Sequence, residues 1–500
     1  MRPLPPHPVV YEVNAWVWLS ELSAREGRNI TLASVPEAEW NAIGALGVDA
    51  VWFMGVWRRS AAGREIARRN PTLMAAFRAA LPDLTEADIV GSAYCVREYT
   101  VDPRLGGDHG LAEARRELAR RGVSLVLDLV PNHVAPDHEW ATASPDLLVR
   151  GSDDDEAREP DAFLRVGAQV FACGRDPFYP AWSDVLQVNA FAASLRAEYR
   201  KLLARLADQC DGVRCDMAML VMNDVFARTW GERAGPAPPE EFWPALIGSV
   251  RARHPAFTFI AEAYWDLEWA LQQHGFDYCY DKRLYDRLLR APASDVRGHL
   301  HADRNYQARL VRFVENHDEA RAGEAFGTER SRAAAALVSS LPGAKLYHDG
   351  QFEGRRTQVP VALGRRPAEA VEPSTQRFYL RLLRAMHGDV FHHGEWALCQ
   401  TTGWPDNDSH RHIIATAWWR GGARHLTIVN LSPQPAQARV FLPWDSRGQA
   451  WRLTDSISGR VFDRSGEELA SDGLFVDLSP WAHHVLAVAA QPADARVPAR

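Results

Sequence analysis

Cysteine is scarce in this chain, and long apolar runs and blocks of basic residues are missing. The six cysteines among 500 residues are scattered and form no C-x-x-C pair, so we expect neither a disulfide framework nor a cysteine zinc site. No run of about 20 apolar residues is present, which argues against a membrane-spanning helix. The first residues carry no apolar run behind Arg2, so we expect no secretory signal. These absences predict a cytoplasmic protein.

Positive charge is also limited. The 57 Lys and Arg residues are outnumbered by 64 Asp and Glu residues, which gives a formal net charge of −7. A mildly acidic chain without a basic block is not expected to bind nucleic acid or an anionic membrane as its main partner. Composition does not indicate an oligomeric state.

The chain does contain a regular alternation of short apolar runs and longer helical patterns. Strands that alternate with helices form parallel βαβ units, and eight such units close into a (β/α)8 TIM barrel. The eight predicted strands are Val9–Val13, Val48–Met54, Ser124–Val130, Gly212–Cys215, Phe257–Ala261, Phe276–Tyr280, Leu310–Glu315 and Ala344–Tyr347.

Two connections are too long to be ordinary barrel loops. Arg58–Glu98 follows the second strand and contains a helical pattern at Arg64–Leu81, and Val134–Val185 follows the third strand. The acidic run Asp153–Glu156 within the second connection is interpreted as a solvated loop. Because both connections follow strands, we expect them over the carboxyl end of the barrel, where they would leave a pocket suited to short or terminal substrates.

The last hundred residues alternate apolar and polar positions and contain frequent turns, which is typical of an antiparallel β-sandwich. The predicted fold class is therefore α/β. We expect a TIM barrel from residues 1–133 and 186–390, an excursion domain at 134–185 after the third strand, and a C-terminal antiparallel β-sandwich at 391–500.

Polar residues stand directly after four of the predicted strands. A single Asp after a strand is usually a helix cap, but four occupied strand ends are not explained in that way. Parallel strands of a barrel end at one common mouth, so we expect these side chains to converge. They are Asp128, Asn132 and His133, then Arg214 and Asp216, then Glu262, then Asn316, His317 and Asp318.

Two of these carboxylates suit opposite chemical roles. Arg214 and Asp216 are two residues apart and share a strand face, and a neighbouring guanidinium keeps a carboxylate ionised, as a nucleophile requires. Glu262 follows an apolar run and has no basic residue within three positions, so burial is expected to raise its pKa and suit it to donating a proton. Such a pair performs glycoside hydrolysis, with retention if the carboxyl groups lie ~5–5.5 Å apart.

With these residues in place, the chain resembles the α-amylase family of glycoside hydrolases. Four segments match the signature regions of that family in its order: Asp128–His133, Gly212–Asp216, Glu262 and Val314–Asp318. The resemblance extends over the whole chain and implies a retaining (β/α)8 enzyme that acts on α-glucosidic bonds.

The resemblance also implies roles for single residues. Asp216 corresponds to the nucleophile of the family, Glu262 to its acid/base and Asp318 to the third carboxylate. His133 and His317 correspond to histidines that hold the sugar in the cleaved subsite.

Three further positions are assigned to substrate binding. Arg214 matches the arginine beside the nucleophile, Asp128 begins the first signature region, and Tyr94 resembles a tyrosine that stacks under the sugar, although Ala93 and Glu98 depart from the family pattern. Asn132 resembles a position that binds calcium in many members. No partner acids can be identified, so no metal ligand or cofactor is assigned and calcium near Asn132 is left open.

Three functions are compatible with these residues. The first is hydrolysis of intracellular α-glucans, maltooligosaccharides or small α-glucosides by double displacement. The second is a transglycosylase or sugar isomerase that forms the same glycosyl-enzyme, and the third is a non-catalytic carbohydrate-binding protein.

Met219 and Leu220 occupy positions where many α-amylases have a lysine and a histidine that bind the leaving glucose unit. Two readings are open for these apolar side chains. Either they weaken binding of long chains at that subsite, or they pack inside the fold and other loops supply the contacts.

Overall fold

The computed structural model describes residues 3–491, so the first two and the last nine residues lie outside the described part. The chain folds into two compact units. The first consists mainly of Val10–Tyr280 with Thr357–Ala368, and the second of Pro5–Val9, Asp281–Arg356 and the residues from Glu369 onward. The division into three domains at 1–133 with 186–390, 134–185 and 391–500 stays a prediction.

Eight parallel strands close into a barrel, as the sequence predicts. Their order around the barrel is β1-β14-β13-β12-β11-β10-β5-β2. Each contains or overlaps one predicted run: β1 Val9–Asn14, β2 Ala50–Met54, β5 Ser124–Leu129, β10 Gly212–Cys215, β11 Thr258–Ala261, β12 Tyr278–Tyr280, β13 Leu310–Arg312 and β14 Ala344–His348.

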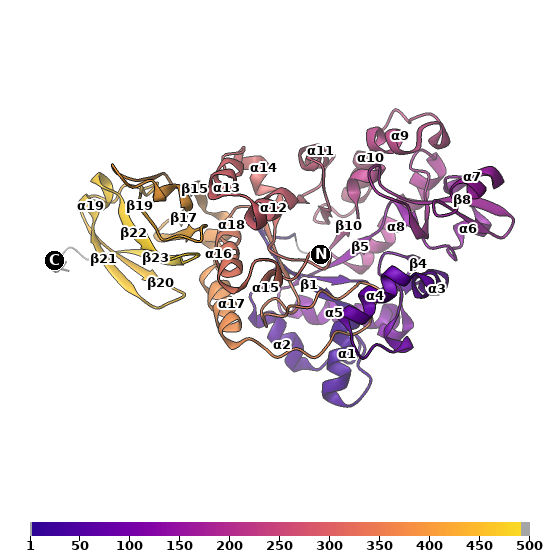
Figure 1. The fold of residues 1–500 in the computed structure, drawn as a ribbon, viewed down its shortest axis with the longest axis horizontal. Coiled ribbons are helices and arrows are strands. Elements are labelled where there is room, and N and C mark those ends of the chain that lie inside the picture. Colours follow the sequence, from indigo (N-terminus) through magenta and orange to yellow (C-terminus); the bar gives the residue numbers. More distant parts are fainter. Residues whose placement is uncertain (1–2, 492–500) are drawn as a thin grey trace. The chain divides into compact units, whose positions relative to one another are not determined.

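The register of three neighbouring strands brings the predicted site residues together. On β10, Arg214 pairs with Asp128 of β5 on one side and with Ile260 of β11 on the other. β5 and β10 are labelled in Figure 1. Gly212 permits the close approach of β10 to β11, because a Cβ atom there would lie 2.7 Å from the carbonyl oxygen of Thr258. Since side chains alternate along a strand, the residues two positions beyond this row, Asp216 and Glu262, continue it past the strand ends.

Helices alternate with the strands. α1 (Ala15–Glu26) begins where the Asn14 side chain accepts hydrogen bonds from the backbone of Trp16 and Val17. In the first unit α8 (Ala193–Gln209) and α10 (Phe242–Arg251) lie side by side (Figure 1), with the rings of Tyr199 and Phe242 6.0 Å apart. The further barrel helices are α2 Glu37–Ala45, α5 Gly107–Arg120, α8 Ala193–Gln209, α10 Phe242–Arg251, α11 Glu268–Gln273, α12 Lys282–Arg290, α13 Ala293–His299, α16 Thr328–Ser339 and α17 Pro373–Ala385.

Both long connections carry structure of their own. The predicted helical pattern at Arg64–Leu81 forms two helices, α3 (Ala61–Arg69) and α4 (Pro71–Ala80), because Asn70 caps the second helix and proline begins it. The second connection forms a four-stranded sheet in the order β6-β9-β8-β7. Its strands are β6 His133–Val134, β7 Phe163–Val166, β8 Gln169–Gly174 and β9 Trp182–Gln187.

The acidic run in this connection is not a loop. It forms the first turns of α7 (Asp153–Arg158), which begins with a capping box between Ser152 and Asp155. Asp155 is buried and binds Arg158 and Arg233, each at 2.7 Å. Acidic residues stabilise the amino-terminal end of a helix, which explains the helical structure of a run that looks solvated in sequence.

The second unit contains the predicted C-terminal antiparallel sheets, drawn in orange to yellow in Figure 1. A six-stranded sheet has the order β15-β17-β18-β23-β20-β21, and a three-stranded sheet has the order β16-β19-β22. Their apolar core includes Trp451, Leu426 and Val440. The strands are β15 Glu395–Leu398, β16 Thr401–Thr402, β17 Ile413–Arg420, β18 Ala423–Asn430, β19 Ala436–Val440, β20 Ala450–Asp455, β21 Val461–Ser465, β22 Leu474–Leu478 and β23 His483–Gln491.

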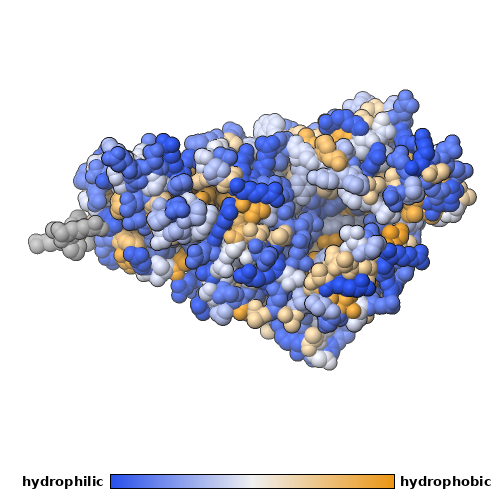
Figure 2. Space-filling model, viewed as in Figure 1, coloured by the Kyte–Doolittle hydropathy of each residue, from blue (hydrophilic) through white to orange (hydrophobic). Residues whose placement is uncertain are grey.

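Hydrophilic residues cover most of the face shown in Figure 2, and hydrophobic residues appear there in small separate groups. Every helix within the described range is too short or too polar to cross a bilayer.

Candidate active site

Arg214 lies at the centre of the candidate site in the first unit. Its Nη1 is 2.9 Å from Oδ1 of Asp216, and its Nη2 is 2.9 Å from Oε2 of Glu262. Asp128 completes the set, with Oδ1 3.5 Å from Nη1. Burial opposes the charge of this fully enclosed guanidinium, but Glu262, two tyrosines and Asp216 raise its pKa well above the ordinary value. One permanent cation therefore holds the two predicted catalytic carboxylates together.

Aromatic rings surround the same guanidinium. Its central carbon lies 5.1 Å from the ring centre of Trp52, 5.2 Å from that of Tyr94 and 5.7 Å from that of Tyr280. These distances are within the range of cation–π attraction. The structure thus brings Tyr94, predicted from the weakest sequence match, to the residues of the main cluster.

The Glu262 carboxylate forms an ion pair with Arg214 and accepts hydrogen bonds from two other groups of the first unit. Besides Arg214, the backbone N–H of Met217 donates to Oε2 at 2.6 Å, and the hydroxyl of Tyr264 donates to Oε1 at 2.9 Å. The Arg214 cation and the two donors favour the ionised carboxylate, whereas burial disfavours it. The rise in the pKa of Glu262 that the sequence predicts stays a prediction.

Met217 has an unusual backbone conformation that makes this contact possible. Its φ of 43° and ψ of 48° place a non-glycine residue in the left-handed region, which costs roughly 1–3 kcal/mol. The turn directs its N–H to the side chain of Glu262, while the next N–H, that of Ala218, donates to the Glu262 carbonyl oxygen at 3.1 Å. Backbone strain is therefore located between the predicted nucleophile and the predicted acid.

Asp128 and His133 are both buried beside this cluster. Oδ2 of Asp128 accepts hydrogen bonds from Trp52 Nε1 at 3.2 Å and from the Gly55 N–H at 3.4 Å. Nε2 of His133 lies 3.2 Å from the carbonyl oxygen of Tyr94, and burial lowers the pKa of His133 to about 4. His133 is thus neutral at physiological pH, with the Nε2 hydrogen directed to Tyr94. The substrate-binding roles of Asp128 and His133 stay predictions.

Asn132 does not fit a calcium site. Its Oδ1 accepts a hydrogen bond from Nε2 of Gln187 at 3.0 Å, and its Nδ2 donates to Oε1 of Gln187 at 3.2 Å. Nε2 of Gln187 also contacts the carbonyl oxygens of Asn132 and Val188, at 2.8 and 3.1 Å. An N–H donor therefore stands where a cation would need an oxygen ligand. No group of three or more His, Cys, Asp or Glu residues in the described part is arranged to hold a metal ion.

His317 and Asp318 follow β13 in the second unit. Nε2 of His317 is 3.0 Å from Oδ2 of Asp318, and Oδ1 of Asn316 accepts hydrogen bonds from the backbone of Asp318 and Glu319, both at 2.9 Å. These contacts hold the loop after β13. The roles of Asp318 as third carboxylate and of His317 in binding sugar stay predictions from the resemblance.

Met219 and Leu220 pack inside the fold. They lie in the short helix Ala218–Val221, and their exposed fractions are 0 and 2%. Side chains without accessible surface offer no contact to a bound sugar. The structure therefore favours the second of the two readings, in which other residues supply the acceptor contacts.

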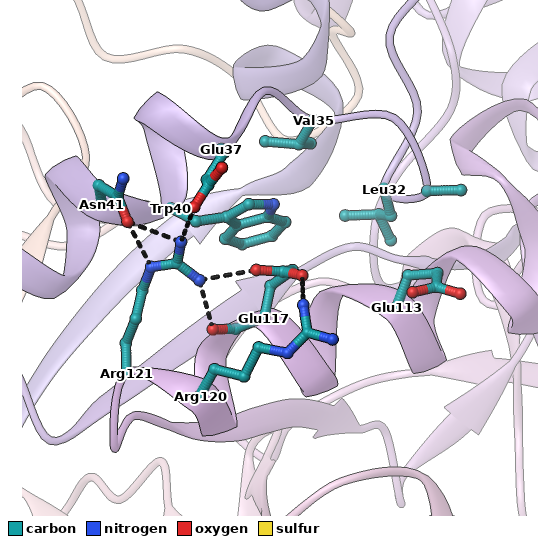
Figure 3. A pocket seen from close by; sticks show the side chains of 10 residues that line it. Leu32, Val35, Glu37, Trp40, Asn41, Glu113, Glu117, Arg120 and Arg121 are labelled. Atoms are coloured by element: carbon teal, nitrogen blue, oxygen red, sulfur yellow. Dashed lines mark hydrogen bonds and ion pairs between the residues drawn. The ribbon is translucent and has the colours of Figure 1, made fainter.

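A cavity of about 520 Å³ lies between α2 and α5 (Figure 3). Its charged groups bind each other: Arg121 donates to Oδ1 of Asn41 and to Oε2 of Glu117, and Arg120 also contacts Glu117. Trp40 forms part of the wall. Because these charges are already paired, we interpret the cavity as a packing feature between two barrel helices.

The sequence reasoning missed Tyr264, Trp52 and Tyr280 as members of the site. Tyr264 stands two residues after Glu262, which could have indicated that both side chains lie on one side of the chain. Trp52 and Tyr280 lie within apolar strands, where burial is sufficient to explain an aromatic residue, so no sequence signal distinguished them.

Comparison with known proteins gives a consistent result. No family model matches the chain. α-Amylase MalA of Haloarcula japonica is 25% identical over 358 residues, which cover 69% of this chain and 47% of that protein. The chain spans about half the length of the curated relatives it matches.

Solved structures agree over almost the full length. A maltogenic α-amylase of Thermotoga neapolitana superposes with a TM-score of 0.67 at 17% identity and covers 97% of this chain and 99% of its own. An α-amylase of Geobacillus thermoleovorans, solved with acarbose, gives a TM-score of 0.65 at 15% identity, with coverages of 98 and 99%. The barrel, the cluster around Arg214 and these relatives agree: the chain is similar to α-amylases in sequence and has their fold.

Proposed function

We propose that the chain is a glycoside hydrolase that cleaves α-glucosidic bonds with retention of configuration. The observation that carries the proposal is the binding of Asp216 and Glu262 to the two terminal nitrogens of one buried guanidinium. Nη1 and Nη2 belong to one planar guanidinium, so the two carboxylates that bind them are held close together. This favours the ~5–5.5 Å separation of retaining enzymes over the ~6.5–9.5 Å that inverting enzymes need for a water molecule.

The geometry supports a division of roles. Asp216, ionised beside Arg214, attacks the anomeric carbon while Glu262 protonates the departing oxygen, and a covalent glycosyl-enzyme forms. Glu262 then accepts a proton from water, which attacks the same carbon and releases Asp216. Asp318 is proposed to stabilise the transition state, and Tyr94, Asp128, His133 and His317 to bind the sugar.

The substrate class follows from the relatives. Their names denote α-amylases and a maltogenic α-amylase, and one neighbour was solved with acarbose. We infer that maltooligosaccharides or short α-glucosides are the substrates. The six cysteines are buried free thiols, which supports a reducing, cytoplasmic location.

The test is product analysis with the purified chain on maltooligosaccharides, sucrose and trehalose. We expect reducing sugar whose first-formed anomer keeps the α configuration by proton NMR. An inverted anomer would refute the mechanism, and transfer products without net hydrolysis would indicate a transglycosylase or isomerase. Loss of iodine staining from amylose with little small sugar released would contradict the preference for short substrates.

Two variants separate the roles of the carboxylates. Asp216→Asn should lower kcat at least about 1,000-fold, because an amide cannot form the ester. Glu262→Gln should cost about 100- to 10,000-fold on maltooligosaccharides and far less on a glucosyl fluoride, which needs no proton. Asp224→Asn, at an exposed position of α9 (Asn223–Trp230), is the matched control and should keep normal turnover.

A further inference from the structure

A cleft of about 1260 Å³ lies in the first unit. It is lined by α3, α8, β7, the strand β4 (Val96–Val101) and the short helix α6 (Trp140–Ala143) with the residues just before it. We call it the α3–α8 cleft; both helices, β4 and α6 are labelled in Figure 1. Arg214 and the two carboxylates that it binds do not line this cleft. It is therefore separate from the candidate active site.

The least exposed part of the α3–α8 cleft is aromatic. Tyr99 and His138 line it with exposed fractions of 8 and 7%, and Trp140 lines it while partly exposed. The rings of His138 and Trp140 pack edge-to-face with centroids 4.6 Å apart, and the Trp140 ring also packs against Tyr199 at 5.9 Å. The Tyr99 hydroxyl accepts a hydrogen bond from the Val130 N–H at 2.8 Å. These contacts fix an aromatic surface of the kind that lines ligand pockets.

His138 presents a hydrogen-bond donor in this surface. Its Nδ1 accepts a hydrogen bond from the backbone N–H of Trp140 at 3.1 Å. Burial lowers the pKa of His138 to about 4, so the ring is neutral at physiological pH and carries its hydrogen on Nε2. Within residues 3–491 this Nε2–H group donates to no other residue. Since buried donors are normally satisfied, this N–H is available to a polar ligand in the cleft.

The charges that line the α3–α8 cleft balance each other. Five Lys or Arg residues and five Asp or Glu residues line it, so it has no net charge that would select an ion. Several are paired, as Lys201 is with Glu198 at 2.7 Å. Arg69, Arg205 and Glu139 also line the cleft, and their side chains form no ion pair or hydrogen bond with any other described residue. The cavity between α2 and α5 differs in this respect, because its charges bind each other.

An aromatic surface, unpaired polar groups and zero net charge together fit a neutral ligand that is rich in hydroxyl groups. The volume exceeds the roughly 300–1,000 Å³ of most small-molecule pockets, so a chain of several sugar units can be accommodated. We propose that the α3–α8 cleft is a non-catalytic binding site for an α-glucan oligosaccharide. The apolar face of a sugar ring packs against Trp140, and the sugar hydroxyls accept hydrogen bonds from His138 and Arg205. The choice of an α-glucan among neutral saccharides rests on the function proposed above.

The test is an NMR titration of the full chain labelled with ¹⁵N at the tryptophan indoles. The chain carries Asp216→Asn so that the ligand is not consumed, and the Trp140 indole signal is identified by its loss in Trp140→Phe. We expect maltotetraose to shift this signal saturably, and cellotetraose, its β-linked isomer, and sodium sulfate to shift it much less. No shift with maltotetraose would overturn the site. An equal shift with cellotetraose or sulfate would overturn its assignment to an α-glucan.

Two arginines serve as variant and control in the same titration. Arg205→Ala, at an exposed position of α8, removes one donor and should raise the Kd of maltotetraose by about 5- to 10-fold at an unchanged melting temperature. Arg228→Ala, at an exposed position of α9, should leave the Kd unchanged. Equal Kd values in both variants would contradict the role of Arg205 in binding.

The outcome also separates this site from the proposed function. A saturable shift of the Trp140 signal in a chain whose wild-type form cleaves no α-glucoside would refute the proposed function and leave the site established. Cleavage of α-glucosides without any shift of the Trp140 signal would remove the site and leave the proposed function intact.

Discussion

Arg214 shows how much one buried residue can organise. Its guanidinium binds Asp216 and Glu262 through separate nitrogens, and the cost of burying its charge is offset by these partners and by three aromatic rings. A lysine ammonium is a point charge that cannot hold two carboxylates in a fixed plane. Arg214→Lys should therefore lower the free energy of unfolding by on the order of 2 kcal/mol and should reduce kcat/KM strongly.

Urea unfolding and steady-state kinetics measure both effects. Arg228→Lys alters an exposed pair with Asp224 on α9 and is the control, with an expected change below about 0.5 kcal/mol. If Arg214→Lys retained wild-type kcat/KM, the simultaneous contact of the guanidinium with Asp216 and Glu262 would not matter for activity.

Because Met219 and Leu220 are buried, we expect their replacement to affect stability and not the preference for long chains. The double replacement Met219→Lys with Leu220→His places two polar side chains where the exposed fractions are 0 and 2%. An unpaired buried amine or imidazole costs several kcal/mol even after its pKa shifts. We expect a large fall in melting temperature and no new preference for long chains.

Met219→Leu keeps an apolar side chain of similar volume and should cost less than about 1.5 kcal/mol. A folded double variant with a raised kcat/KM for maltotetraose relative to an aryl glucoside would show that these positions reach the substrate after all.

At the scale of elements, the sequence was most informative where hydrophobic patterns are long. All eight barrel strands lie within or overlap the predicted runs, because buried parallel strands are continuous apolar segments. The acidic run was interpreted wrongly as a loop, since the capping box that makes Asp153–Arg158 helical depends on the side chains of Ser152 and Asp155. The break between α3 and α4 could have been predicted from the dipeptide Asn70-Pro71, because the residue before a proline rarely continues a helix. The apolar periodicity continues across this dipeptide and therefore predicted one helix.

The hydrogen bonds between Asn132 and Gln187 join two elements at the position that resembles a calcium-binding one. Asn132 follows β5, and Gln187 ends β9 of the excursion sheet. In Gln187→Leu three buried oxygens lose their N–H donor, namely the side-chain and carbonyl oxygens of Asn132 and the carbonyl oxygen of Val188. Each such loss costs about 1–3 kcal/mol, so we expect the melting temperature to fall markedly.

Because the side chains of Asn132 and Gln187 bind each other, we expect a calcium chelator to leave the melting temperature of the wild-type chain unchanged. Gln169→Leu, at the partly exposed first residue of β8, is the matched control and should have a small effect. A fall in melting temperature on chelation, reversed by calcium, would show that a cation stabilises the chain.

For the whole molecule, strand order and strand-end chemistry were sufficient to predict the barrel and the cluster of Asp128, Arg214, Asp216 and Glu262. The protonation chemistry could not be predicted in the same way. The N–H of Met217 reaches Glu262 through left-handed backbone, the Tyr264 hydroxyl reaches it from two residues further along the chain, and the register between β10 and β11 brings Arg214 to it. These contacts depend on three-dimensional packing that no local pattern encodes.

Five histidines that are buried or partly buried, within the described residues, give the molecule a defined response to acid. Burial is the largest cause in each case, and it lowers the pKa of His7 to about 3 and the pKa values of His133, His138, His425 and His483 to about 4. In the unfolded chain each has the ordinary value near 6.5. As the pH falls from 6.5 toward 4, the unfolded chain binds protons that the folded chain does not, so stability is complete above pH 6.5 and is lost across this window.

Each buried histidine contributes up to about 1.4 kcal/mol per pH unit within that window. We therefore expect the melting temperature to drop steeply between pH 6.5 and 4.5, before Glu372, whose pKa is lowered to about 2, begins to take up protons. His138→Gln should reduce the slope, whereas His109→Gln, at an exposed position of α5, should leave it unchanged. The measurement is thermal unfolding at closely spaced pH values. A melting temperature that stays constant down to pH 4.5 would mean that the buried imidazoles take up protons without unfolding the chain.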